Sequence, residues 1–264
     1  MSVKMMIGKL VILILIFICL GSLVHVNSET NDNLAVYLLG LADQSVLAGQ
    51  VRDANNYYRK AADLCSTSSL AMAVATHADA SAMEVMNLNS YLESINYAYL
   101  SAIKLADSTP LSLAVATNAD ATGSKDGNPL LYQYVVLKSF EKSIYLADST
   151  SMAMAVATTA DAMSTKNGNP NILYQTVENA YLRALELSDM TALSLSVAAN
   201  ANGVGIKNSN PSQYDHVIEM SLEKAIKQSQ VISEIKQVIY DASMYGRFPS
   251  IISKAMTKLR ELSQ

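Results

Sequence analysis

Three aspartates recur along the chain at equal spacing, and carboxylates can bind cations or a basic partner. Asp79, Asp120 and Asp161 are 41 positions apart, and Asn202 takes the same place in a fourth copy. Like charges aligned side by side repel each other unless they are solvated or paired. Two hypotheses follow. Either the carboxylates form a ladder that binds cations or a basic partner, or they and the threonines three positions earlier satisfy backbone or inter-repeat hydrogen bonds.

Lysines recur in three similar loops, SKDGNP (124–129), TKNGNP (165–170) and IKNSNP (206–211). Asp and Asn around a Gly are also found in calcium-binding EF-hand loops, but here the ligands are too few and the terminal Glu is missing. The loops therefore predict a turn followed by a helix N-cap. Lys125, Lys166 and Lys207 form a repeated edge and are candidate partner-binding residues.

One position changes its chemistry from copy to copy. It holds His77, Asn118, Thr159 and Asn200 in otherwise matched segments. A variable position on a regular scaffold is either simply exposed or part of a specificity surface. We take these four residues as further candidates for partner binding.

Other reactive residues form no recognisable site. The three histidines are far apart in the sequence, and no metal-ligand spacing links them to a cysteine. There is no nucleophile elbow, phosphate loop or dinucleotide fingerprint. The sequence thus predicts a non-enzymatic protein without cofactor or metal.

These residues belong to four tandem segments that align without a gap. The segments begin at Leu64, Leu105, Leu146 and Leu187, each 41 positions after the last, for example LADSTPLSLAVATNADA and LADSTSMAMAVATTADA. Each contains a second block with an apolar residue and a small residue three positions later, as at Tyr181 and Ala184. This spacing keeps one stripe along a helix.

The second helix of each unit is expected to begin at an Asn-Pro pair, because Asn is a good N-cap and Pro suits the first turn. The pairs are Asn128-Pro129, Asn169-Pro170 and Asn210-Pro211, and Gly127 and Gly168 would close the preceding helix.

The first block of each unit is harder to assign. Met152, Met154 and Val156 alternate as in a strand, whereas Met152, Ala155 and Val156 also fit a helical stripe. Alanine dominates the block and favours a helix; a strand would instead give a horseshoe of strand–helix units. The small residues that we expect to face neighbouring helices are Ala73, Ala75, Ala114, Ala116, Ala155 and Ala157.

The second block resembles the second helix of tetratricopeptide and Sel1-like repeats, as in NAYLRALEL (179–187) and NYYRKAADL (56–64). The aromatic, Ala and Leu residues three apart match over about a quarter of each unit. The period is 41 rather than 34, and the first helix lacks the family's Trp, Leu-Gly and Tyr positions. The resemblance implies a superhelical scaffold whose concave face binds peptides or proteins.

The N-terminal residues differ from the rest. Lys4 and Lys9 precede an apolar run from Leu10 to Leu20, and Val26-Asn27-Ser28 offers a cleavage site. This pattern is typical of a signal peptide, although retention of residues 10–26 as an anchor stays open. After cleavage Cys65 is the only cysteine, so packing alone must hold the fold.

The sequence therefore predicts an all-α fold, an α-solenoid of tandem 41-residue helix–turn–helix repeats behind a signal segment. The predicted organisation is a signal peptide or anchor (1–28), an N-terminal cap with a partial repeat (29–63), four repeats (64–227) and a C-terminal helical cap (228–264).

We expect a secreted or cell-envelope interaction scaffold that binds a protein or peptide on its concave or loop face. The alternatives are a self-associating surface component and a carrier of an apolar or glycan ligand. The net charge of −4 without a basic cluster argues against nucleic acid, and only an uncleaved N-terminal segment would contact a membrane.

Overall fold

A computed structural model of the chain describes residues 29–169 and 171–264. All the regular structure in these residues is helical, and they contain no strand. The prediction of an all-α protein is confirmed, and the Ala-rich first block is a helix rather than a strand. The predicted signal segment, residues 1–28, lies outside the described residues.

The described residues divide into two compact units, one that ends at residue 106 and one that comprises residues 107–264. In the first unit, an N-terminal helix (residues 29–47) is followed by four elements. These are α2 (Val51–Leu64), α3 (Ser68–Glu84), the 3₁₀ turn η1 (Leu88–Ser90) and α4 (Leu92–Leu105). Helix α3 packs against α4 and against α2.

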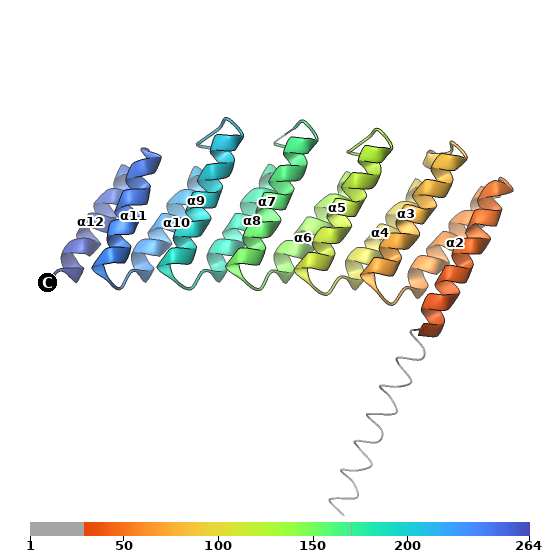
Figure 1. Cartoon of the computed structure of the whole chain (residues 1–264), viewed down its shortest axis with the longest axis horizontal. Helices are drawn as coiled ribbons and strands as arrows, with labels where there is room; N and C mark the ends of the chain where they lie inside the picture. The colour runs from red at the N-terminus through yellow and green to blue at the C-terminus, as the bar shows by residue number, and fades with distance from the viewer. Residues whose placement is uncertain (1–28, 170) are drawn as a thin grey trace, which may run out of the picture. The chain divides into compact units, whose positions relative to one another are not determined.

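The second unit consists of four helical hairpins. Their helices are α5 (Thr109–Lys125), α6 (Gln133–Leu146), α7 (Thr150–Lys166), α8 (Tyr174–Leu187), α9 (Thr191–Lys207), α10 (Asp215–Gln228), α11 (Ile232–Tyr245) and α12 (Pro249–Leu262). Each odd-numbered helix packs against the next odd-numbered helix, and each even-numbered helix against the next even-numbered one. The unit thus has a first-helix layer (α5, α7, α9, α11) and a second-helix layer (α6, α8, α10, α12), joined by turns at both edges (Figure 1).

The ends of the first helices follow the expected chemistry. The Thr67 hydroxyl accepts a hydrogen bond from the Leu70 amide at 3.2 Å, and the Ser149 hydroxyl accepts one from Met152 at 3.3 Å. After helix α5 the backbone turns through the left-handed region at Gly127, with φ +77°, as predicted.

The predicted starts of the second helices are wrong by about one turn. Helix α6 begins at Gln133 and α10 at Asp215, not at Asn128 or Asn210. The reason is visible at Asn128, whose side-chain oxygen accepts from the Leu130 amide at 3.2 Å and so forms a local turn. Pro170 lies outside the described residues.

Half of the alanines expected at helix contacts are buried. Ala75, Ala116 and Ala157 are fully buried, whereas Ala73 and Ala155 are exposed. Ala114 is half-buried, and Met152 of the proposed stripe is 37% exposed. The true stripe in α7 is Ala153, Val156, Ala157, Ala160 and Asp161. These residues follow the 3–4 spacing of a helix face, from which Ala155 is rotated away.

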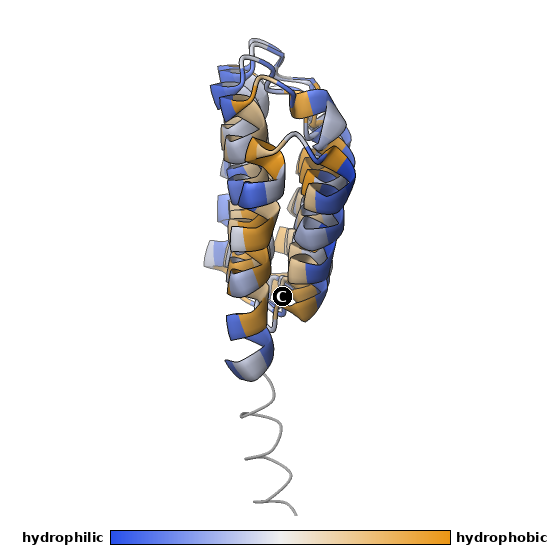
Figure 2. Cartoon of the chain, turned by 90° about the vertical axis from the view of Figure 1, so that its right-hand side faces the viewer, coloured by the Kyte–Doolittle hydropathy of each residue, from blue (hydrophilic) through white to orange (hydrophobic). Residues whose placement is uncertain are grey.

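The predicted stripe of the second helices is confirmed. Its aromatic or leucine positions, at Tyr58, Tyr99, Phe140, Tyr181 and Leu222, are fully buried. Figure 2 shows that hydrophilic residues lie mostly on the outer sides of the helices, whereas hydrophobic residues lie mostly on the sides that face the other layer.

Candidate interaction site

The variable position lies on the solvent-facing side of the first helices. Asn200 is exposed, and its side-chain nitrogen donates to the Ser196 carbonyl at 3.0 Å. Thr159 is half-buried and donates to the Ala155 carbonyl at 2.7 Å, while Asn118 is also half-buried. The side chains of Asn200 and Thr159 therefore bond back to their own helices.

Two of the predicted lysines hold buried carboxylates of the preceding repeat. Lys166 donates to Asp120 at 2.8 Å and to the Ser124 hydroxyl at 3.3 Å, and Lys207 donates to Asp161 at 2.5 Å. The Asp120 and Asp161 side chains are 6% and 3% exposed, whereas those of the lysines are about half exposed. A carboxylate so deeply buried requires such partners.

Asparagines that follow the lysines complete each contact, and sequence reasoning missed them. Asn167 donates to Asp120 at 2.7 Å, and Asn208 donates to Asp161 at 2.8 Å. We call this arrangement of Asp, Lys and Asn the clasp. A Lys-Asn pair stands 46 and 47 positions after both Asp120 and Asp161, and this recurrence was a sequence signal that could have revealed the clasp.

The threonines of the same motif bond locally. Thr117 and Thr158 donate to carbonyls three residues earlier, each at 3.1 Å. The hypothesis of local and inter-repeat hydrogen bonds is therefore confirmed for the Asp and Thr positions that the structure resolves within the second unit.

The last repeat replaces the clasp with an arginine. Arg247 donates to Asn202, which stands at the Asp position, at 2.9 Å and to Asp215 at 2.6 Å. One guanidinium thus holds both a side chain of α9 and the start of α10.

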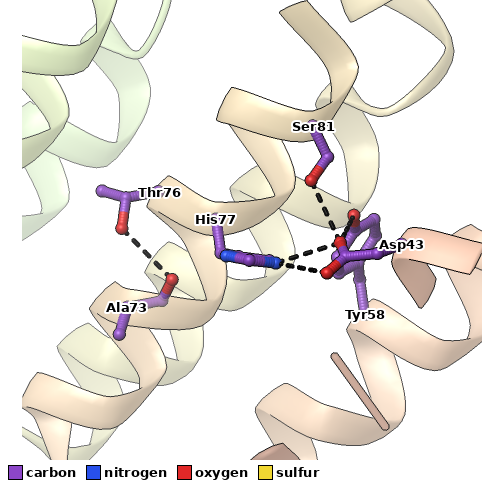
Figure 3. Close-up of polar contacts among 6 residues, drawn as sticks. All are labelled: Asp43, Tyr58, Ala73, Thr76, His77 and Ser81. Carbon is purple, nitrogen blue, oxygen red and sulfur yellow. Dashed lines mark hydrogen bonds and ion pairs between the residues drawn. The ribbon is translucent and has the colours of Figure 1, made fainter. Parts of the chain in front are cut away.

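The first unit contains a different polar cluster around Asp43 (Figure 3). His77 and Ser81 of α3 point toward this carboxylate, with the His77 Nε2 at 2.8 Å and the Ser81 hydroxyl donating at 3.1 Å. The Tyr58 hydroxyl donates to it at 3.2 Å, and burial raises the pKa of this phenol. Thr76 instead bonds to its own helix.

His77 replaces the clasp lysine here for a simple reason. Glu84 stands in the 41-residue register at the place of Lys166 and Lys207, and an acidic side chain cannot donate to Asp43. The carboxylate, not the imidazole, is at the centre of the cluster. It therefore differs from the Ser–His–Asp order of nucleophilic catalysis, in which His bonds to Ser.

The surface is hollowed at both places. A groove of about 410 Å³ runs between α7 and α9, and another of about 370 Å³ lies beside His77. The first is lined by Thr158, Asp161, Ala199, Asn200, Gly203, Val204 and Lys207. It brings together two of the predicted partner-binding residues, Asn200 and Lys207.

Within the described residues, no group of three His, Cys, Asp or Glu side chains is arranged to hold a metal. No helix in this part of the chain has the length and apolar character to cross a membrane.

The chain matches no protein-family model, and a comparison with curated proteins gives no significant match.

Proposed function

We propose that the chain is an exported, non-enzymatic scaffold of the α-solenoid type that binds a protein or peptide on its first-helix layer. The observation that carries this proposal is the groove between α7 and α9. The hairpin packing repeated through the second unit supports the solenoid, and the buried ladder of Tyr181 and Ala184 supports a tetratricopeptide-like or Sel1-like packing mode.

The groove offers hydrogen-bonding groups of both kinds. Asn200 lines the groove and uses its amide nitrogen within α9, which leaves its side-chain oxygen available as an acceptor. Lys207 donates one N–H to Asp161 and has two more to offer. A peptide backbone carries one donor and one acceptor per residue, so it matches such a surface.

The groove is also shallow enough for a backbone to come close. Ala199, Gly203 and Thr158 have short side chains, and a Cβ added at Gly203 would meet no atom within 4 Å. Within the second unit this position alternates between Asn118, Thr159 and Asn200, which would let neighbouring repeats select different parts of one partner.

The test is a pull-down with the chain as bait in an extract of the cell envelope in which it is made. The variant Gly203→Arg places a long side chain in the groove, and the Cβ it adds meets no atom within 4 Å; circular dichroism checks that the variant stays folded. The matched control is Tyr145→Arg, because Tyr145 is 80% exposed and belongs to the second-helix layer, away from the groove.

Capture of the same one or two proteins by the wild type and the control, but not by Gly203→Arg, is the expected result. Equal capture by all three baits, or by none, would contradict the proposal. Reversal of Lys166 or Lys207 is a poor test, because it would place a second acid beside a buried carboxylate.

A further inference from the structure

Among the described residues, no helix packs on one side of the N-terminal helix, and the equivalent side of α3 is an internal packing surface. Alignment of Ala42 with Ala78, both fully buried, puts Leu41 at the place that His77 takes in α3. His77 faces the preceding first helix, because it contacts Asp43 there. Leu41 therefore faces the side on which the described residues contain no preceding helix.

This side is apolar. Leu34, Tyr37 and Leu41 are spaced three and four residues apart and so lie on one face of the helix. Leu34 is 44% and Tyr37 62% exposed. The outer face of a terminal repeat is usually polar, whereas a contiguous apolar stripe marks a surface that another molecule covers.

Helix α11 packs on α9, α10 and α12, and its side away from α9 has no further first helix among the described residues. In α7, Thr158 and Asp161 line the groove shared with the following first helix. Two repeats later these positions hold Tyr240 and Ser243, so they face the place of the next first helix. Tyr240 is 59% exposed, and Ile239 is half-buried although the equivalent Ala157 is fully buried.

The N-terminal helix and α11 also match because each lacks the charged clasp residue that a contact between them would bury. The clasp needs an Asp on one repeat and a Lys on the next. Ser243 stands in the Asp position of α11, and Ala48 of the N-terminal unit stands in the Lys207 position. Contact between these ends would therefore leave no clasp charge buried without its partner.

A lysine at the N-terminal end is placed for the same contact. In the second-helix layer, Arg183 donates to the Ala147 carbonyl at 3.1 Å, and Lys224 donates to the Leu185 carbonyl at 2.6 Å. Both acceptors lie at the end of the preceding second helix. Lys60 occupies the same register position in α2, is exposed, and has no hydrogen bond or ion pair in the described part of the chain.

We propose that copies of this chain associate head to tail, with the N-terminal helix of one copy packed on α11 of the next. Tyr37 and Leu41 cover Tyr240 and Ile239, and Lys60 donates to the carbonyls at the end of α12. This contact repeats the packing of α7 on α9 between two molecules. It is heterologous, so each copy keeps one free end of each kind and the assembly can grow.

The first experiment measures the weight-average mass by sedimentation from about 1 to about 100 μM, where a small interface would become populated. The protein is expressed from its full sequence and purified with whatever N-terminal processing the cell carries out. The variants Tyr37→Asp and Tyr240→Asp each place a charge in one half of the contact. The control is Val36→Asp, because Val36 is 57% exposed and adjacent to Tyr37 but lies outside the stripe.

We expect the mass of the wild type and the control to rise with concentration, and the association of either tyrosine variant to weaken at least about tenfold. A wild type that stays monomeric throughout, or a control that fails like Tyr37→Asp, would overturn the proposal.

Mixing the two variants tests the direction of the contact. Tyr37→Asp keeps an intact α11 and Tyr240→Asp keeps an intact N-terminal helix, so the mixture should form dimers and nothing larger. Association that survives Tyr240→Asp alone would indicate a symmetric contact between two N-terminal helices and would refute head-to-tail packing. The groove variant Gly203→Arg lies outside this contact, so the outcome is independent of the proposed function.

Discussion

At the scale of single residues, buried polar groups explain why the repeat keeps certain side chains. The position of Asp161 was evident from the sequence, because the residue recurs at a fixed spacing. Its partners were not, because Lys207 and Asn208 lie 46 and 47 positions away and meet it only through helix packing. Sequence periodicity identifies equivalent positions, whereas contacts between repeats depend on how the helices stack.

The clasp should contribute measurably to stability. Lys207→Met keeps the aliphatic stem but leaves the buried Asp161 with Asn208 as its remaining clasp partner. We expect the free energy of unfolding to fall by about 1–3 kcal/mol, since a buried charge loses one of two donors. Denaturant unfolding measures this, with the exposed Lys227→Met as control, and equal effects of both changes would show that the clasp adds nothing.

Two buried phenols should make the fold sensitive to alkali. Burial first, and then the nearby Asp161 carboxylate, raise the pKa of Tyr181 and Tyr214 above the ordinary value near 10. Below about pH 10 both folded and unfolded chains keep these protons. Above it the unfolded chain loses protons that the folded chain retains, so stability falls as pH rises.

The variant Tyr214→Phe should reduce this alkaline loss. The phenylalanine ring keeps the stacking on Tyr174, whose ring centroid lies 5.4 Å from that of Tyr214. The Tyr214 hydroxyl that the substitution removes is buried and makes no hydrogen bond in the described residues. At neutral pH we expect unchanged or slightly greater stability. Urea midpoints between about pH 8 and pH 11 test this against Tyr240→Phe, where the ring is exposed; equal slopes with pH would refute the explanation.

At the scale of elements, local chemistry predicts helix ends better than helix contacts. The turn at Gly127 was correctly predicted, because a left-handed turn depends on the residue at that position. The Asn-Pro pairs misled, because Asn128 caps a local turn rather than the helix that follows. The buried face of α7 was also partly misread, since alanine fits both faces of a helix and only packing decides between Ala155 and Ala157.

The turn after α9 places a serine in a backbone conformation that favours glycine. Ser209 adopts φ +57°, where α5 and α7 are followed by Gly127 and Gly168 with similar angles. Ser209→Gly should stabilise the chain by about 0.5–1 kcal/mol, because glycine adopts this conformation without steric cost. Thermal unfolding measures this effect, with Ser212→Gly in the same loop as the control. If Ser209→Gly stabilises the chain no more than the control does, the φ of Ser209 is not a source of strain.

At the scale of the whole molecule, the 41-residue repeat is the feature from which the architecture follows. The 41-residue period predicted the succession of paired helices, and the all-helical fold confirms the class. The division into two compact units was not predicted, because the repeat continues through residue 106 without a change in its pattern. Surface function was the least accessible from the sequence, since the groove between α7 and α9 combines residues that lie about one repeat apart.

The most direct test of the proposed function places a photo-crosslinking amino acid at Ala199 in the groove or at Tyr145 in the second-helix layer, where the side chain is 80% exposed. Each protein is irradiated in the cells that make it, and the adducts are resolved by mass. The account predicts discrete adducts with another protein from position 199, lost when Gly203→Arg is added, and none from position 145. Adducts from position 145 alone, or from neither position, would contradict binding on the first-helix layer.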